Sequence, residues 1–380
     1  MSEDDWQRAV LGEVGGRTSA ETGPSTVSAM ENHQPVDGDS WAQQQSPTPG
    51  HVVPPPPPVA PAARAVPLQP PALVPVLAPE AEALVAGKPR KGDSAGRRLA
   101  RGLRRLVASS AAWETDEVTR VARELQQPIT TGRQIVVTSV RGGAGKTTIA
   151  ALLASAYAHH RPDPVLVMEA NPTLGTLPVR VGAPSLRWTM SDVARVLTPS
   201  MRFDQVIGYL VELPESGWLL PGSKGQIGAQ MSLEEYRDVA VALRRYFAIT
   251  VVDCESLPGE LARSAMAGAQ ARVLVTPATV EGVASTRSVL EWMGSLPRPM
   301  LPRTVVALTE TTPHTAIDLA AAARYLRLGD VRVVRLPYDR QLAGGGAIRL
   351  SLLGEATREA AARLGAELLN RAVGGHGRQA

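Results

Sequence analysis

The sequence has little of what stabilises small secreted domains or large aromatic cores. Its 380 residues include a single cysteine, Cys254, and aromatic residues make up 4% of the total. A single cysteine excludes a disulfide framework within the chain and favours a reducing compartment. With so few aromatic residues, a core must consist mainly of Ala, Val, Leu and Ile, which is typical of parallel sheets covered by helices.

Long apolar runs and export signals are also missing. Pro, Arg or Glu interrupts every apolar stretch before it reaches the roughly 20 residues that a membrane-spanning helix requires. Residues 3–5 are acidic, where a secretory signal would be basic and then apolar. The six histidines show no metal-ligand spacing, so we expect no zinc site. These absences predict a cytoplasmic protein that lies at most on the inner face of the plasma membrane.

Proline is abundant, and much of it lies before residue 80. Residues 1–93 lack sustained apolar periodicity and contain five consecutive prolines at 54–58. Proline cannot donate ladder hydrogen bonds, and such a run favours a solvated polyproline II helix. We therefore predict a disordered Pro-rich tail over residues 1–93. It serves either as an inert spacer or as a docking segment for a protein partner.

Positive charge gathers between residues 88 and 105, just after this tail. Leu99, Leu103 and Leu106 recur there at helical spacing among arginines, which predicts a basic amphipathic helix. Such a helix packs on the next domain, lies on an anionic membrane or contacts nucleic acid, and the sequence leaves these alternatives open. We assign residues 94–130 to this helical segment, with a second helix at about 115–126.

From residue 131 to 373, short apolar runs alternate with amphipathic helical patterns. Crossover units of this kind predict an α/β fold, with a mostly parallel twisted sheet and helices on both faces. A short flexible tail follows at 374–380. The apolar runs lie at 135–140, 165–168, 218–220, 249–252, 273–275, 305–308 and 331–336.

A glycine-rich loop follows the first of these runs and precedes a helical pattern. Backbone N–H groups of such a loop converge on phosphates, and the helix N-terminus adds positive potential. We expect Lys146 to reach the β- and γ-phosphates and the Thr147 hydroxyl to bind Mg²⁺. The loop consists of Arg141, Gly142, Gly143, Ala144, Gly145, Lys146, Thr147 and Thr148.

Residues 141–148 resemble the deviant Walker A loop of the MinD/ParA ATPases, whose usual form is Lys-Gly-Gly-Val-Gly-Lys-Thr-Thr. This resemblance implies a P-loop NTPase that binds ATP and Mg²⁺ and hydrolyses ATP. In the family, the first lysine crosses to the partner subunit of an ATP-bound dimer, and Arg141 stands at that position here. The resemblance thus implies an ATP-dependent homodimer, although arginine differs from lysine in geometry.

Two further stretches resemble this family. The apolar run that ends at Asp253 is similar to the Walker B strand, which implies that Asp253 holds Mg²⁺ through water. Pro337 and Asp339, followed by glycines at 344–346, resemble the last strand and the loop beside the adenine. The Pro-rich front and the basic segment also resemble the EspI-like members associated with type VII secretion. That likeness implies a place on the cytoplasmic side of a secretion apparatus.

The second strand departs from the family pattern of Asp-x-Asp. Glu169 keeps the first carboxylate, but Asn171 replaces the second. An amide can orient water but cannot accept its proton, and general-base assistance is worth about 10²–10⁴-fold. With Lys146 and Asp253 as the other catalytic candidates, we expect slow hydrolysis. Three functions stay open: an ATPase switch, a non-hydrolysing nucleotide-binding scaffold, and a ParA-like DNA-positioning protein.

Overall fold

The structure is a computed structural model, and it describes residues 71–77, 91–93 and 111–374, without residues 172, 174, 215, 216 and 227. The basic helix predicted within 94–107, most of the predicted tail over 1–93 and residues 375–380 lie outside the described residues.

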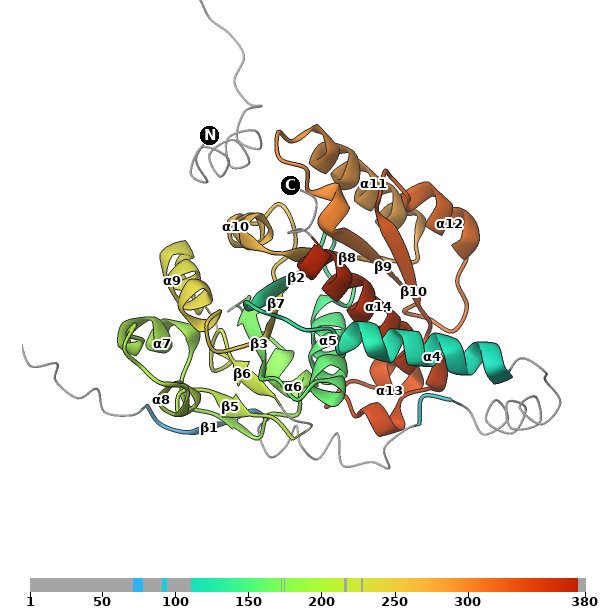
Figure 1. Cartoon of the computed structure of the whole chain (residues 1–380). Coiled ribbons are helices and arrows are strands. Elements are labelled where there is room, and N and C mark those ends of the chain that lie inside the picture. The colour runs from blue at the N-terminus through green and yellow to red at the C-terminus, as the bar shows by residue number, and fades with distance from the viewer. Residues whose placement is uncertain are drawn as a thin grey trace, which may run out of the picture. The chain divides into compact units, whose positions relative to one another are not determined.

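One sheet organises the described residues (Figure 1). Its eight strands run in the order β10-β9-β8-β2-β7-β3-β6-β5, and every neighbouring pair is parallel except β5 with β6. All seven strands predicted from apolar runs are confirmed, with ends displaced by no more than two residues. The strands are β2 (Arg133–Ser139), β3 (Val165–Ala170), β5 (Val211–Glu212), β6 (Trp218–Leu220), β7 (Ile249–Cys254), β8 (Ala271–Pro277), β9 (Thr304–Thr309) and β10 (Arg332–Leu336).

Helices cover both faces of this sheet, as the alternating pattern predicted. Along β2, Ile135 and Val137 belong to one apolar cluster and Val136 to the other, because successive strand residues point to opposite faces. The Ile135 face carries α4 (Ala111–Leu125), α5 (Lys146–His160), α6 (Leu177–Arg180), α13 (Arg340–Ala343) and α14 (Glu355–Val373). The Val136 face carries α7 (Met190–Val196), α8 (Phe203–Ile207), α9 (Leu233–Leu243), α10 (Glu260–Gly268), α11 (Val280–Ser295) and α12 (Leu319–Leu326).

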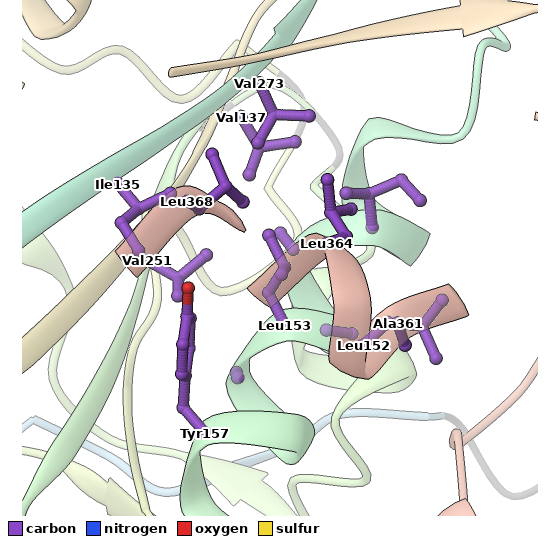
Figure 2. Packing of buried hydrophobic residues seen from close by; sticks show 14 of the residues in the cluster. Ile135, Val137, Leu152, Leu153, Tyr157, Val251, Val273, Ala361, Leu364 and Leu368 are labelled. Carbon is purple, nitrogen blue, oxygen red and sulfur yellow. The ribbon is translucent and has the colours of Figure 1, made fainter. Parts of the chain in front are cut away.

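Helix α5, which follows the glycine-rich loop, is anchored in the apolar core on the Ile135 face of the sheet (Figure 2). Tyr157 of α5 is fully buried, and its hydroxyl donates to the carbonyl oxygen of Gly365 at 2.8 Å. A Cβ on Gly365 would lie 3.1 Å from Cδ2 of Leu125, so glycine lets α14 approach α4 and α5 closely. These buried contacts fix the position of α5, and with it the position of the loop at its start.

Two short segments before residue 94 pack on the domain, although the sequence predicted disorder throughout 1–93. Strand β1 (Val74–Pro75) pairs in antiparallel fashion with β4 (Ser185–Leu186). Further on, Gly92 N donates to the Leu352 carbonyl oxygen at 2.8 Å. Both contacts join backbone groups, which need no apolar periodicity, and an edge position tolerates the missing N–H of Pro75. Hydropathy patterns therefore give no signal for them.

Candidate nucleotide-binding site

The glycine-rich loop connects β2 to α5 at the carboxyl edge of the sheet. Gly143 and Gly145 have φ values of 73° and 94°, in the left-handed region that favours glycine. A Cβ on Gly142, Gly143 or Gly145 would meet no atom within 4 Å, so the outer side of the loop is open. Gly145 caps α5 without a side-chain hydrogen bond, and the first turn holds no acidic residue. The amides of this helix start are therefore suited to an anion.

The loop is tied to the sheet from behind. The Thr309 hydroxyl at the end of β9 lies 3.1 Å from the Ala144 carbonyl oxygen and 3.2 Å from that of Thr276. The Ser139 hydroxyl donates to the Arg141 carbonyl oxygen at 2.7 Å. These bonds hold the carbonyl groups of the loop towards the sheet.

Lys146, Thr147 and Asp253 come together at the start of α5, while their roles in binding phosphate and Mg²⁺ stay predictions. Lys146 Nζ donates to Ser256 Oγ at 2.9 Å, and the Thr147 hydroxyl lies close enough to the Asp253 carboxylate to lower its pKa. Burial raises the pKa of Asp253 to about 7, against the opposing effects of Thr147 and the Lys146 charge. Burial likewise lowers the pKa of Lys146, with Asp253 acting in the other direction.

The Asp253 carboxylate has one buried oxygen, Oδ1, with no hydrogen-bond partner among the described residues. A buried unsatisfied carboxylate oxygen is costly, and the hydroxyl of Thr147 lies near the same carboxylate. Oxygen ligands of this kind fit Mg²⁺, which is usually held by one or two protein groups together with phosphate oxygens and water. Within the described ranges, no group of three or more His, Cys, Asp or Glu side chains could hold a metal ion. One hydroxyl and one carboxylate are the kind of donor set that Mg²⁺ takes together with phosphate oxygens and water.

Glu169 lies on β3 beside Asp253 of β7, its partner in the strand register. Its buried carboxylate accepts hydrogen bonds from Leu177 N and Gly222 N, both at 3.1 Å. Burial raises the pKa of Glu169 to about 7, although these backbone hydrogen bonds oppose the rise. A Cβ on Gly175 would lie 2.0 Å from Glu169 Oε1, so Gly175 itself packs tightly against the carboxylate. This geometry makes Glu169 a positioning residue for that loop.

Asn171 directly follows β3 and is half-buried. Because β3 and β7 run parallel, Asn171 lies at the same edge of the sheet as Asp253. Its role in orienting water stays a prediction.

A cavity of about 210 Å³ opens beside the loop. One wall comes from the loop and α5, and the other from the segment after β10, including Pro337 and Asp339. Asp339 is buried, and its carboxylate accepts from Gln341 N and Gly354 N, each at 2.8 Å. Its oxygens thus hold the wall in place by capping α13, while Pro337 adds an apolar surface. Contact of either residue with adenine stays a prediction.

Arg141 is exposed, and its Nε donates to Ser285 Oγ of α11 at 3.4 Å. It does not line the cavity. An exposed, weakly held guanidinium is free to reach a second molecule, but the contact across a dimer stays a prediction.

Sequence reasoning missed three residues of this region. Ser256 contacts Lys146, Glu310 lines the cavity, and Arg180 both lines the cavity and donates to Thr148 Oγ1 at 2.8 Å. The one available signal was Arg180, a lone charge in the apolar stretch Leu-Pro-Val-Arg.

These features together define a P-loop NTPase fold: a parallel sheet, a glycine loop between strand and helix, and an acidic residue at the end of a neighbouring strand. No protein-family model matches the chain. The ParA family ATPase from Chlorobium tepidum TLS is similar, with a TM-score of 0.51 and 15% identity over 61% of this chain and 98% of that one. The septum site-determining protein MinD from Pyrococcus horikoshii OT3, complexed with Mg-ADP, has a TM-score of 0.45 and 19% identity over 63% and 95% of the two chains.

In sequence, the chain is similar to the ESX-1 secretion-associated protein EspI of Mycobacterium tuberculosis strains CDC 1551 and H37Rv. It is 26% identical to EspI over 229 residues, which are 58% of this chain and 34% of EspI. The chain thus spans about a third of the length of the curated relatives it matches. The resemblance to MinD/ParA-type ATPases and to EspI is confirmed, and the chain has the fold of the ParA ATPases.

Proposed function

We propose that the chain binds ATP with Mg²⁺ and acts as a nucleotide-dependent switch that hydrolyses ATP slowly. The observation that carries this proposal is the convergence of Lys146, Thr147 and Asp253 at an open glycine loop, with Asp253 Oδ1 unpartnered. Each group matches a need of bound triphosphate: amides for the phosphates, an ammonium for the terminal oxygens, and a hydroxyl with a carboxylate for the metal.

The residues of the chain would divide the work as follows. The amides of residues 142–148 hold the phosphate chain, and Lys146 exchanges its bond to Ser256 for phosphate oxygens. Thr147 and Asp253 hold Mg²⁺, which neutralises developing charge on the phosphate oxygens when bound. Pro337 and its neighbours form the wall for the base.

Water activation is the weak step. Asn171 offers an amide where a carboxylate would accept a proton, and both oxygens of Glu169 are engaged by backbone amides. Positioning and charge still favour phosphoryl transfer without a general base. We therefore propose slow hydrolysis. Asn171 and Glu169 also support a second candidate function, that of a scaffold that binds ATP without cleaving it.

The similarity to a secretion-associated protein supports a partner of that kind on the cytoplasmic face of the membrane. None of the helices among the described residues is long and apolar enough to span a bilayer. We propose that an ATP-dependent homodimer presents the Pro-rich tail or the basic segment to this partner or to the membrane surface. DNA positioning is the third candidate, and its main support is the basic stretch 88–105.

Phosphate release from Mg-ATP by the full chain tests this function. The parent protein should release phosphate slowly, and Lys146→Ala should release none above the buffer rate. Lys224→Ala is the matched control, because Lys224 acts electrostatically on Asp192 and does not line the cavity. ATP binding without any phosphate release would replace the switch by the scaffold, whereas absence of ATP binding would overturn both.

A further inference from the structure

Arg180 ends α6 on the wall of the cavity, and it is 9% exposed. Its Nη2 donates to Thr148 Oγ1 at 2.8 Å and to the Leu342 carbonyl oxygen at 3.1 Å. Its Nη1 donates to the Gly346 carbonyl oxygen at 3.3 Å. One guanidinium thus joins the first turn of α5 to the loop that closes the other side of the cavity.

Within the described residues, no carboxylate forms an ion pair with this guanidinium. Among the ion pairs formed by the described residues, none includes Arg180. Burial lowers its pKa, and no neighbouring charge opposes that effect. Carbonyl and hydroxyl oxygens satisfy the N–H groups, but a buried cation without a counter-charge is unfavourable. The position is therefore suited to an anionic ligand.

The cavity reaches the loop at Thr148, but it does not include the residues proposed for the terminal phosphates and Mg²⁺. Gly143, Gly145, Thr148 and Arg180 line the cavity, whereas Lys146 does not. A nucleotide with its base and ribose in the cavity and its terminal phosphates at Lys146 would carry its α-phosphate past Thr148. That is the place where the Arg180 guanidinium lies.

We propose that Arg180 binds the α-phosphate of the nucleotide and joins α5 to residues 342–346 around it. This inference rests on the proposed function, because it assumes that a nucleotide occupies the cavity. A charge-assisted hydrogen bond to phosphate is about twice as strong as a neutral one. Because ATP and ADP share the α-phosphate, Arg180 contributes equally to the binding of both. Lysine cannot replace it fully, since one ammonium does not span the three acceptors.

The test is calorimetric titration of the full chain with Mg-ATP and with Mg-ADP. Arg180→Met should weaken both nucleotides by about tenfold or more, and by the same factor. Arg180→Lys, which keeps the charge and serves if the Met variant fails to fold, should weaken both by a smaller, equal factor. The matched control is Arg272→Met. Arg272 is 4% exposed and donates to the carbonyl oxygens of Met266 and Ala269, but it does not line the cavity.

The outcomes separate this inference from the function on which it rests. Equal losses for ATP and ADP in the Arg180 variants, with parental affinity in Arg272→Met, would support it. Unchanged affinity in the Arg180 variants would overturn the inference alone, and so would a loss confined to ATP, which would place the contact at the γ-phosphate. A parent protein that binds neither nucleotide would refute the proposed function itself.

Discussion

The pH dependence of stability tests whether burial raises the pKa of Glu169. Burial raises its pKa to about 7 from an ordinary value of 4.5, so the folded protein holds this proton more tightly than the unfolded chain does. The stability that the protonated form contributes is therefore fully present below about pH 4.5. It is lost as the pH rises through about 7.

The size of the effect follows from the two pKa values. The rise from 4.5 to about 7 corresponds to roughly 3 kcal/mol at about 1.4 kcal/mol per pH unit. Most of this loss falls between pH 5 and pH 8, where the folded and unfolded chains bind different numbers of protons. Glu169→Gln removes the titrating group, so its unfolding free energy should lack this part of the pH dependence.

Urea unfolding of the two proteins at intervals from pH 5 to pH 8 measures the effect. The parent protein should lose roughly 2–3 kcal/mol relative to Glu169→Gln across this range. The exposed residue Glu291 supplies the control, since Glu291→Gln should follow the parent curve. A constant difference between parent and Glu169→Gln would refute the reasoning. A rise with pH would mean that the amides of Leu177 and Gly222 stabilise the ionised form more than burial opposes it.

Two further predictions concern the dimer and the rate. Arg141→Ala should keep the ATP affinity of the parent, because Arg141 is exposed and does not line the cavity, but it should abolish any ATP-dependent dimer in sedimentation velocity. The exposed residue Arg195 supplies the control, Arg195→Ala. A parent protein that stays monomeric with saturating Mg-ATP would contradict the dimer. Asn171→Asp should raise steady-state phosphate release about tenfold or more at similar ATP affinity, because it restores a proton acceptor. A phosphate-release rate equal to that of the parent would contradict the proposal that Asn171 limits activation of the attacking water.

The sequence was sufficient for seven of the eight strands of the sheet and for the loop, because both depend on local patterns. Strands β2, β3, β7, β8 and β9 each contain an apolar run and are almost entirely buried. The order strand, glycines, Lys146, Thr147, helix is contiguous. Asp253 was found in the same way, as the acidic residue that ends an apolar run. Physical causes that act within a few residues can be read from a single sequence.

Arg180 and Asp339 show the limit of predictions made from local sequence patterns. The partners of Arg180 lie 32, 162 and 166 residues away in the chain, so only tertiary packing brings them together. Asp339 was predicted beside the adenine, and the structure places it in the cavity wall with its carboxylate capping α13. An Asp just before a short helix is itself a capping signal, so this part could have been read from the sequence.

The affinity of Lys146→Ala for Mg-ATP tests the central claim most directly. The side chain supplies the ammonium at the loop, and its loss removes a charge-assisted contact worth about 1.5–3 kcal/mol. The account predicts an affinity at least about tenfold weaker than that of the parent, with an unchanged thermal midpoint in the absence of nucleotide and parental affinity in Lys224→Ala. Parental affinity in Lys146→Ala would contradict the assignment of this loop as the nucleotide site.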